Sequence, residues 1–217
     1  MLPNEVYSWD ITYLTSAVKG YFYYLYMVMD IFSRKIVGWQ VYDNQSSALA
    51  ADLMTDICRR ENIQPSQVTL HSDNGGPMKG ATLLATLQTL GVTPSFSRPS
   101  VSNDNPYSES LFKTMKYTPG AFNDRFEGLQ EARQWVEQFV NWYNNEHCHS
   151  GIQYVTPNER HALKDAEILA KRTLVYQQAK EKNPSRWSGE VRNWKRVEKL
   201  ELNPTNNQKI EAQKGAA

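Results

Sequence analysis

The sequence predicts a mixed α/β domain, because three strand-like segments open the chain and helical and strand-like segments then alternate. Residues 7–14, 21–29 and 35–42 are rich in aromatic and β-branched residues, and the polar pair Ser33-Arg34 indicates a hairpin between the last two. With 217 residues and 40% hydrophobic content, the chain can build one substantial core with a small appendage.

Further segments complete the predicted core in the order helix, strand, helix, strand, helix. Residues 46–60 repeat apolar side chains at helical spacing behind a serine N-cap signal, and residues 80–90 form a helical pattern that Gly91 ends. Residues 68–73 and 92–97 are predicted strands. A long helix from residue 129 is indicated by apolar residues at helical spacing: Leu129, Ala132, Val136, Phe139 and Tyr143.

The C-terminal part differs in character from the core. Residues 158–176 form a helical pattern, residues 186–203 alternate apolar and polar residues in an extended pattern, and the polar end from residue 204 is expected to be disordered. The predicted organisation is a core domain at 1–160, a helical and extended appendage at 161–205, and a disordered tail at 206–217.

Three carboxylates, Asp10, Asp73 and Glu109, lie in contexts that would bring them to one place. Asp10 belongs to the first strand, and Asp73 ends a later strand just before the turn signal Asn74-Gly75. Glu109 begins a helix after Asn105-Pro106, an N-cap followed by proline at the first helical position. Two strands and a helix can together form one acidic pocket.

Clustered carboxylates repel one another, so three at one site need a reason to stay ionised. Divalent cations supply that reason, because Mg²⁺ prefers hard oxygen ligands. On the predicted helix, Lys113 and Lys116 share the face of Glu109, whereas Leu111 and Met115 point nearly opposite. We therefore expect a metal site with two lysines beside it that contact phosphate.

The motifs around these carboxylates resemble the DDE transposases of bacterial insertion sequences, which are relatives of retroviral integrases. The resemblance covers roughly residues 5 to 205, and 35 residues separate Asp73 from Glu109 as in that family. The segments that carry it are Trp9-Asp10-Ile11-Thr12, His71-Ser72-Asp73-Asn74-Gly75, Glu109 with Lys113 and Lys116, residues 30–39, Trp142-Tyr143-Asn144-Asn145, His149-Ser150-Gly151 and Thr156-Pro157.

This resemblance implies a ribonuclease-H-like mixed sheet flanked by helices, and metal-dependent DNA nicking and strand transfer in transposition. It implies two Mg²⁺ or Mn²⁺ ions, with Asp10 as the bridging ligand and Asp73 and Glu109 each completing one ion. The expected partners are transposon ends and target DNA, further copies of the chain on DNA, and a helix-turn-helix module encoded upstream or in a partner reading frame. The candidate DNA contacts are Lys113, Lys116, Asn74, Arg98 and His149.

Several alternatives stay open at this point. Asp30 is the rival for the first carboxylate, although its place at a hairpin fits turn capping better. His71 either orients Asp73 or is a packed strand histidine, and the loop 98–105 either moves or is an ordinary connector. Residues 147–149 do not make a zinc site without a second ligand pair. A ribonuclease-H-like nuclease and a non-catalytic DNA-binding relic are the competing functions.

Charge is divided unevenly along the chain. Residues 1–170 hold 13 Lys and Arg against 18 Asp and Glu, whereas residues 171–217 hold 11 against 5. A basic tail can contact DNA phosphates independently of sequence, or it can simply be a solvated extension. We find no signal peptide pattern and no apolar run that could span a membrane, so a cytoplasmic protein that joins the bacterial nucleoid when bound to DNA is expected.

Overall fold

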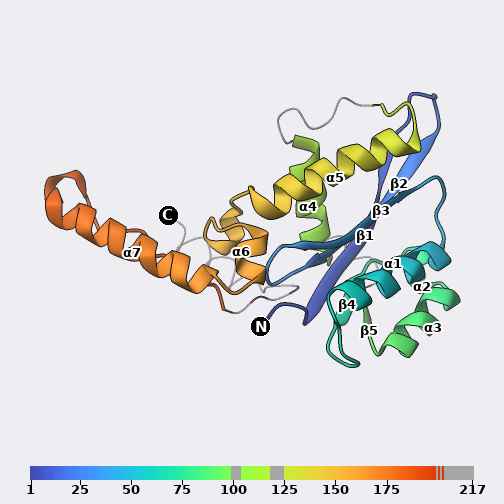
Figure 1. Ribbon diagram of the computed structural model, residues 1–217, viewed down its shortest axis with the longest axis horizontal. Coiled ribbons are helices and arrows are strands. Elements are labelled where there is room, and N and C mark those ends of the chain that lie inside the picture. The colour runs from blue at the N-terminus through green and yellow to red at the C-terminus, as the bar shows by residue number, and fades with distance from the viewer. Residues whose placement is uncertain (99–103, 118–124, 199, 201, 203–217) are drawn as a thin grey trace.

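A mixed five-stranded sheet lies at the centre of the protein, in a computed structural model that describes residues 1–98, 104–117, 125–198, 200 and 202. The strand order is β3-β2-β1-β4-β5 (Figure 1). The first three strands pair antiparallel, and β4 and β5 add in parallel beyond β1, which confirms the predicted mixed α/β class. The strands are β1 (Val6–Thr15), β2 (Phe22–Asp30), β3 (Ile36–Tyr42), β4 (Thr69–Ser72) and β5 (Thr93–Phe96).

Helices cover both faces of this sheet (Figure 1). Successive strand side chains point to opposite faces, so β2 gives Tyr26 and Val28 to one apolar core and Met27 and Met29 to the other. The first core lies under α1 (Ser47–Arg60), α2 (Gly76–Lys79) and α3 (Ala81–Leu90). The second lies under α4 (Pro106–Tyr117) and α5 (Leu129–Asn145).

Two local signals in the sequence set helix ends as predicted. The Ser46 hydroxyl accepts a hydrogen bond from the Ala48 amide at 3.1 Å and caps α1. Gly91 ends α3 in the left-handed region with φ at 68°, and a Cβ there would come within 2.7 Å of the Pro65 Cα. The short helix α2 was not predicted, because the preceding Asn74-Gly75 indicated only a turn.

Side chains form hydrogen bonds with backbone groups along the outer edge of β3. The Asn144 side chain accepts from the Ile36 amide at 2.9 Å and donates to the Ile36 carbonyl at 3.0 Å. Arg133 donates to the Val41 carbonyl from two nitrogens, at 3.1 and 3.0 Å. At the opposite edge, β5 contains Pro94, which has no amide hydrogen to donate. The contacts of Asn144 and Arg133 with β3 also fix α5 across the sheet.

The prediction of a single helix over residues 158–176 is wrong. The segment divides into α6 (Pro157–His161) and α7 (Asp165–Lys182), because Leu163 takes a left-handed conformation with φ at 58° that no helix interior accommodates. The short 3-10 turns η1 (Ser150–Ile152) and η2 (Pro184–Arg186) precede α6 and follow α7.

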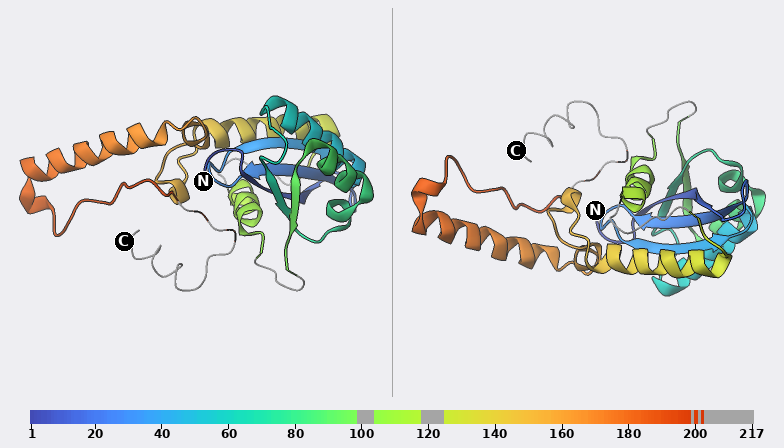
Figure 2. Two further views of the ribbon diagram at one scale, coloured as in Figure 1. Left: turned by 90° about the horizontal axis from the view of Figure 1, so that it is seen from below. Right: turned by 90° about the horizontal axis from the view of Figure 1, so that it is seen from above.

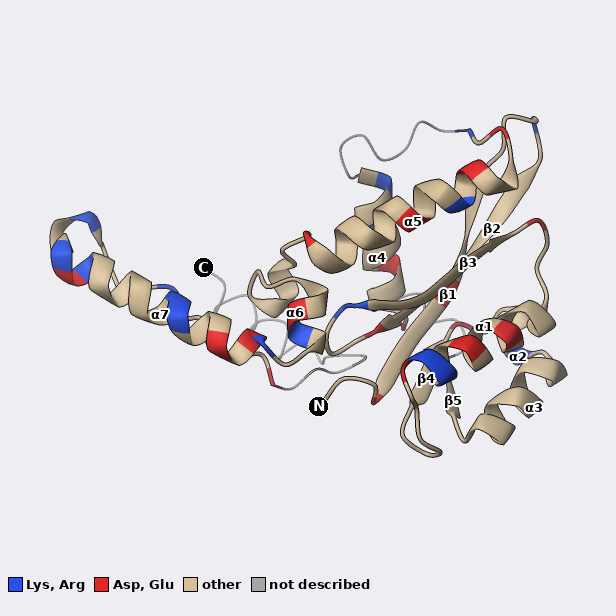
Figure 3. Cartoon of the chain, in the orientation of Figure 1, with Lys and Arg blue, Asp and Glu red and all other residues tan. Residues whose placement is uncertain are grey.

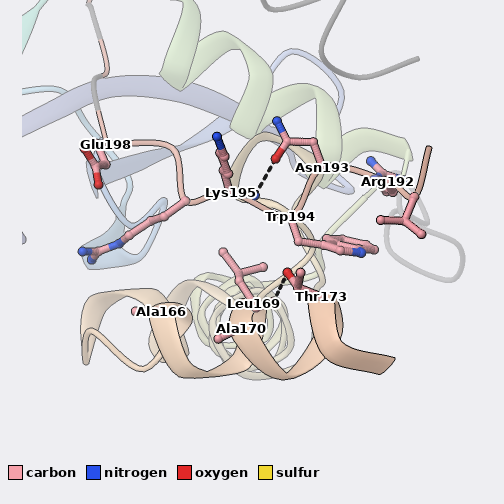
Figure 4. Close-up of a pocket in the computed structure, with 11 residues that line it drawn as sticks. Ala166, Leu169, Ala170, Thr173, Arg192, Asn193, Trp194, Lys195 and Glu198 are labelled. Carbon is pink, nitrogen blue, oxygen red and sulfur yellow. Dashed lines mark hydrogen bonds between the residues drawn. The ribbon is translucent and has the colours of Figure 1, made fainter. Parts of the chain in front are cut away.

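Residues 165–198 form a structure that we call the arm: α7 leads away from the sheet, and the following segment returns beside it (Figure 2). Trp194 is buried in the returning segment and packs in one apolar cluster with Leu169 of α7. Figure 4 shows its ring above α7, near Leu169 and Thr173. The Arg192 guanidinium lies 4.9 Å from the centre of the Trp194 ring.

A buried ion cluster joins the arm to the body. The Arg160 side chain is fully buried and donates to the Phe32 carbonyl at 2.7 Å, to Asp165 at 3.0 Å, and to the Val197 carbonyl. Arg196 donates to the same Asp165 oxygen at 2.7 Å. Burial lowers the pKa of Arg160 to about 10, so the guanidinium is still charged at neutral pH. Arg160 thus contacts the body and both sides of the arm.

The domain division at residue 160 stays a prediction, and the expected disordered tail at 206–217 lies outside the described residues. Residues 204 and 205, the predicted end of the appendage, also lie outside the described residues. Among the described helices, none combines the length and the apolar character needed to cross a bilayer.

The ion cluster predicts a large effect for Arg160→Met. Removing Arg160 leaves Arg196 as the remaining ion-pair partner of buried Asp165 and takes away the donor to the Phe32 and Val197 carbonyls, so we expect a loss of about 3 to 5 kcal/mol in the free energy of unfolding. Urea unfolding followed by tryptophan fluorescence measures it. Arg59→Met is the control, because Arg59 forms an exposed pair with Asp56 and should change stability by less than about 0.5 kcal/mol. Equal effects for the two variants would contradict this role of Arg160.

Candidate active site

Asp10 lies within β1, between the antiparallel partner β2 and the parallel partner β4. It shares a strand face with Ser8, the face that α4 covers. Its carboxylate is partly buried and accepts a hydrogen bond from the Ile11 amide at 2.7 Å. Burial, and after it the negative charges of Asp73 and Glu109, raise the pKa of Asp10 to about 6. Asp73 and Glu109 therefore both act electrostatically on Asp10.

Asp73 directly follows β4, next to the position of Asp10 on the neighbouring strand. The Ser97 hydroxyl donates to its carboxylate at 2.8 Å, and the Ser97 amide donates to the Ser72 carbonyl at 2.9 Å. The Asn74 side chain donates to the Ser97 carbonyl at 2.7 Å. The ends of β4 and β5 are thus tied together, which orients Asp73.

Glu109 lies in the first turn of α4 with its side chain exposed. Lys113 and Lys116 are also exposed on this helix, whereas Leu111 and Met115 are buried, so the predicted division of the helix into two sides is confirmed. In the described part of the chain, the Glu109 carboxylate has no hydrogen bond or ion pair. Its position depends on how the start of α4 is held.

Three buried side chains hold that start against β1. Ser8, Asn105 and Ser108 are each at most 2% exposed. The Ser8 oxygen lies 2.5 Å from the Asn105 side-chain oxygen and 2.7 Å from the Ser108 oxygen. The Asn105 side-chain nitrogen donates to the Trp9 carbonyl at 3.2 Å. We call these three side chains the α4 anchor.

A second set of contacts holds Asp104, the residue before Asn105. The His71 ring lies on β4 and contacts the Asp104 carbonyl through Nε2 at 2.9 Å and Ser95 through Nδ1 at 3.0 Å. A carbonyl can only accept, so Nε2 carries the hydrogen. Arg98 donates to the Asp104 carboxylate through its amide, Nε and Nη2 at 2.8 to 2.9 Å, and these bonds lower the pKa of Asp104 to about 2.

These contacts decide several of the open alternatives. His71 is a packed strand histidine that binds the start of α4 and makes no hydrogen bond to Asp73. Asp30 is a buried turn cap, since its carboxylate accepts from the Ser33 amide at 2.7 Å, the Ser33 hydroxyl at 2.6 Å and the Asn4 amide at 2.8 Å. Residues 99–103 of the connecting loop lie outside the described part.

Three of the candidate DNA contacts have partners within the chain. Arg98 is paired with Asp104, and Asn74 is bonded to Ser97. The His149 ring accepts from the Gly151 amide at 3.0 Å, and burial, with nearby Arg34 and His147, lowers the pKa of His149 to about 3. His149 is therefore neutral and is held in its own loop. Lys113 and Lys116 form no ion pair in the described residues.

The donor chemistry of the three carboxylates suits a hard divalent cation, because all the ligand atoms are carboxylate oxygens. Within the described residues, however, no three His, Cys, Asp or Glu side chains converge closely enough to form a finished metal site. The raised pKa of Asp10 reflects an acidic, partly buried environment that a bound cation would relieve.

The α4 anchor was not predicted from the sequence. Ser8 stood among aromatic and β-branched strand residues, and Asn105 was interpreted only as a helix cap. One signal was present: Ser8 and Asp10 are two residues apart on a strand, so they share a face, and a serine on a buried face requires a partner.

Two family models described as integrase core domain match this chain, one over residues 2–102 and the other over residues 90–157. A transposase for insertion sequence element IS904 from Lactococcus lactis is 33% identical over 160 residues, which are 72% of this chain and 61% of that protein. The transposase InsF for insertion sequence IS3A from Escherichia coli is 34% identical over 159 residues, which are 72% of this chain and 54% of that protein.

A solved structure supports the same fold. A chain in the structure of a simian T-cell lymphotropic virus intasome superposes with a TM-score of 0.61 and 16% sequence identity, over 74% of this chain and 55% of that chain. This likeness confirms the ribonuclease-H-like fold. The present chain spans 61% and 54% of the length of the two transposases.

The raised pKa of Asp10 predicts how pH acts on the metal-free protein. The pKa is 3.8 in the unfolded chain and about 6 in the folded one, so the folded state favours protonated Asp10. Stability should therefore fall as pH rises from about 4 to about 6, by at most about 3 kcal/mol. Asp10→Asn should lack this fall, which urea unfolding in excess chelator measures. Parallel stability profiles for the two proteins would disprove the assignment.

Proposed function

This chain belongs to the integrase core family, and we propose that it is the catalytic part of an insertion-sequence transposase that nicks DNA and joins the freed end to a target. The observation that supports the proposal is the placement of Asp10 on β1, Asp73 directly after β4 and Glu109 in the first turn of α4, with the charges of Asp73 and Glu109 both raising the pKa of Asp10. The relatives are named transposases, and the chain spans only part of their length.

We infer that Asp10, Asp73 and Glu109 would together hold two Mg²⁺ or Mn²⁺ ions, with Asp10 as the shared ligand that the family resemblance implies. When bound, such ions activate the attacking oxygen and stabilise the departing one in a phosphoryl displacement. The chain itself orients two of the carboxylates. The Ser97 hydroxyl donates to the Asp73 carboxylate, and the Glu109 side chain is exposed, so that its carboxylate can reach a bound ion.

Lys113 and Lys116 are the best candidates for contacts to the DNA backbone. Both are exposed on the helix that carries Glu109, and a lysine ammonium binds phosphate as a point charge. Asn74, Arg98 and His149 are weaker candidates, because each would have to give up a hydrogen bond within the chain.

The arm is a second surface for DNA. Much of its positive charge is already engaged: Arg172 donates to two carbonyls, Arg196 pairs with Asp165, and Lys180 pairs with Glu190. Lys182 and Arg186 form no ion pair in the described residues. Figure 3 shows lysine and arginine gathered at the outer end of α7, where a duplex could contact them.

The proposed partners are transposon ends, target DNA and further copies of this chain, together with an upstream helix-turn-helix module that supplies sequence recognition. A strand-transfer assay with pre-nicked transposon ends separates this function from the two others. A nuclease of the same fold would cut without joining, and a DNA-binding relic would do neither.

Replacing each carboxylate by its amide should abolish nicking and joining. Asp10→Asn, Asp73→Asn and Glu109→Gln keep the size of the side chain but remove a charged oxygen ligand. The assay uses labelled transposon ends with Mg²⁺ or Mn²⁺. Asp52→Asn is the control, because Asp52 is exposed on α1 and does not contact this site. Joining by an Asp10→Asn protein, or joining in excess chelator, would refute the metal-dependent mechanism.

Neutralising the free charges at the end of the arm should weaken DNA binding. In the double variant Lys182→Gln with Arg186→Gln, the negative slope of log affinity against log salt should become less steep by about 2. Each lost phosphate contact removes about one released counterion. Arg59→Gln, exposed on α1, should leave the slope unchanged. Fluorescence anisotropy across a salt series measures both, and equal slopes for all proteins would exclude the arm as a phosphate contact.

A further inference from the structure

We propose that Ser8, Asn105 and Ser108, the α4 anchor, are positioning residues that set Glu109 opposite Asp10. This inference rests on the proposed function, because positioning matters only if the two carboxylates share a ligand. We assign none of the three side chains a direct contact with DNA or metal. They act through the backbone of α4.

The hydrogen bonds of the anchor have one consistent direction. The Asn105 side-chain oxygen can only accept, so the Ser8 hydroxyl donates to it. Ser8 has then used its single hydrogen, and the Ser108 hydroxyl donates to the Ser8 oxygen. Asn105 donates onward to the Trp9 carbonyl. Ser8 is thus the central member of a buried network in which each hydroxyl has a partner.

The anchor residues lie next to the carboxylates in sequence. Ser8 precedes Asp10 by two positions on the same face of β1, and Ser108 directly precedes Glu109 on α4. A hydrogen bond between Ser8 and Ser108 therefore links the two backbone segments that carry Asp10 and Glu109. With this bond in place, α4 cannot slide or rotate on β1 without breaking it.

Apolar packing alone would not fix this register. Leu111, Phe112 and Met115 pack α4 onto the sheet, but apolar contact is non-directional and tolerates small shifts. Repulsion between the Glu109 and Asp10 charges favours a shift that separates them. A fully satisfied buried network resists this shift, because the donors and acceptors of the broken hydrogen bonds would be buried without water to replace their partners.

The experiment compares Ser8→Ala and Ser108→Ala with the matched control Ser33→Ala. Ser33 is also a fully buried serine with two side-chain partners, Asp30 and His161, but it has no contact with the three carboxylates. Five quantities are measured for each protein: the stability to urea, the amide hydrogen exchange of residues 109–112 and, for strand transfer with pre-nicked ends, the half-saturating Mn²⁺ concentration, kcat and the KM for DNA.

We expect Ser8→Ala to lower kcat and to raise the half-saturating Mn²⁺ concentration by roughly 10- to 100-fold, with the KM for DNA unchanged. Exchange at residues 109–112 should become faster. Ser33→Ala should lose comparable stability without these changes. Ser108→Ala keeps the bond between Ser8 and Asn105, so it should give a smaller effect and serves if Ser8→Ala fails to fold. Losses in the double variant should be less than additive.

The inference is overturned if the Ser8 and Ser33 variants lose activity equally at equal folded fraction, or if exchange in α4 is unchanged. It is distinguishable from failure of the proposed function. If the unmodified protein neither binds Mn²⁺ nor joins DNA, the function is wrong, whereas hydrogen exchange still reports whether Ser8 holds α4 on β1.

Discussion

The central constraint on the proposed site is that its three negative charges, Asp10, Asp73 and Glu109, come from elements far apart in sequence. Asp10 and Asp73 are placed by the parallel pairing of β1 and β4, a rigid arrangement. Glu109 is on a helix, so its place depends on the contact between α4 and β1. Ser8, Asn105 and Ser108 make that contact with hydrogen bonds inside the core, where the loss of a partner is costly. The geometry of the site thus follows from buried polar groups beside it.

In the arm, arginine side chains form the hydrogen bonds and ion pairs that hold the structure. Formal charge suggested that residues 171–217 are a free basic surface, but a guanidinium serves equally well as a multiple donor within the fold. Arg192 and Arg196 contact an aromatic ring and a buried carboxylate within the arm, and Arg172 donates to carbonyls at residues 153 and 154 of the body. Within the described part of the arm, fewer basic side chains are therefore free to contact DNA than the sequence count suggests.

Sequence patterns were sufficient for elements whose causes are local. Strand composition, the Ser46 cap and the Gly91 stop placed β1 to β5, α1 and α3. The single site that the spacing of the three carboxylates indicates stays a prediction. The remainder depends on tertiary contacts. The break at Leu163 accompanies burial of Asp165 against Arg160, and the partners of His71, Arg98 and Asn105 lie 6 to 97 residues away. Such pairings leave no periodic signal in one sequence.

The guarded edges of the sheet have a consequence for self-association. Asn144 and Arg133 saturate backbone groups of β3, and Pro94 interrupts the donors of β5, so neither border accepts a further strand easily. Continuous sheets that run from one molecule into the next are therefore disfavoured, and so is the amyloid-like stacking that begins there. Copies of this chain that meet on DNA would have to join through helical surfaces or the arm. Their union would then depend on side-chain complementarity, which can be specific and reversible.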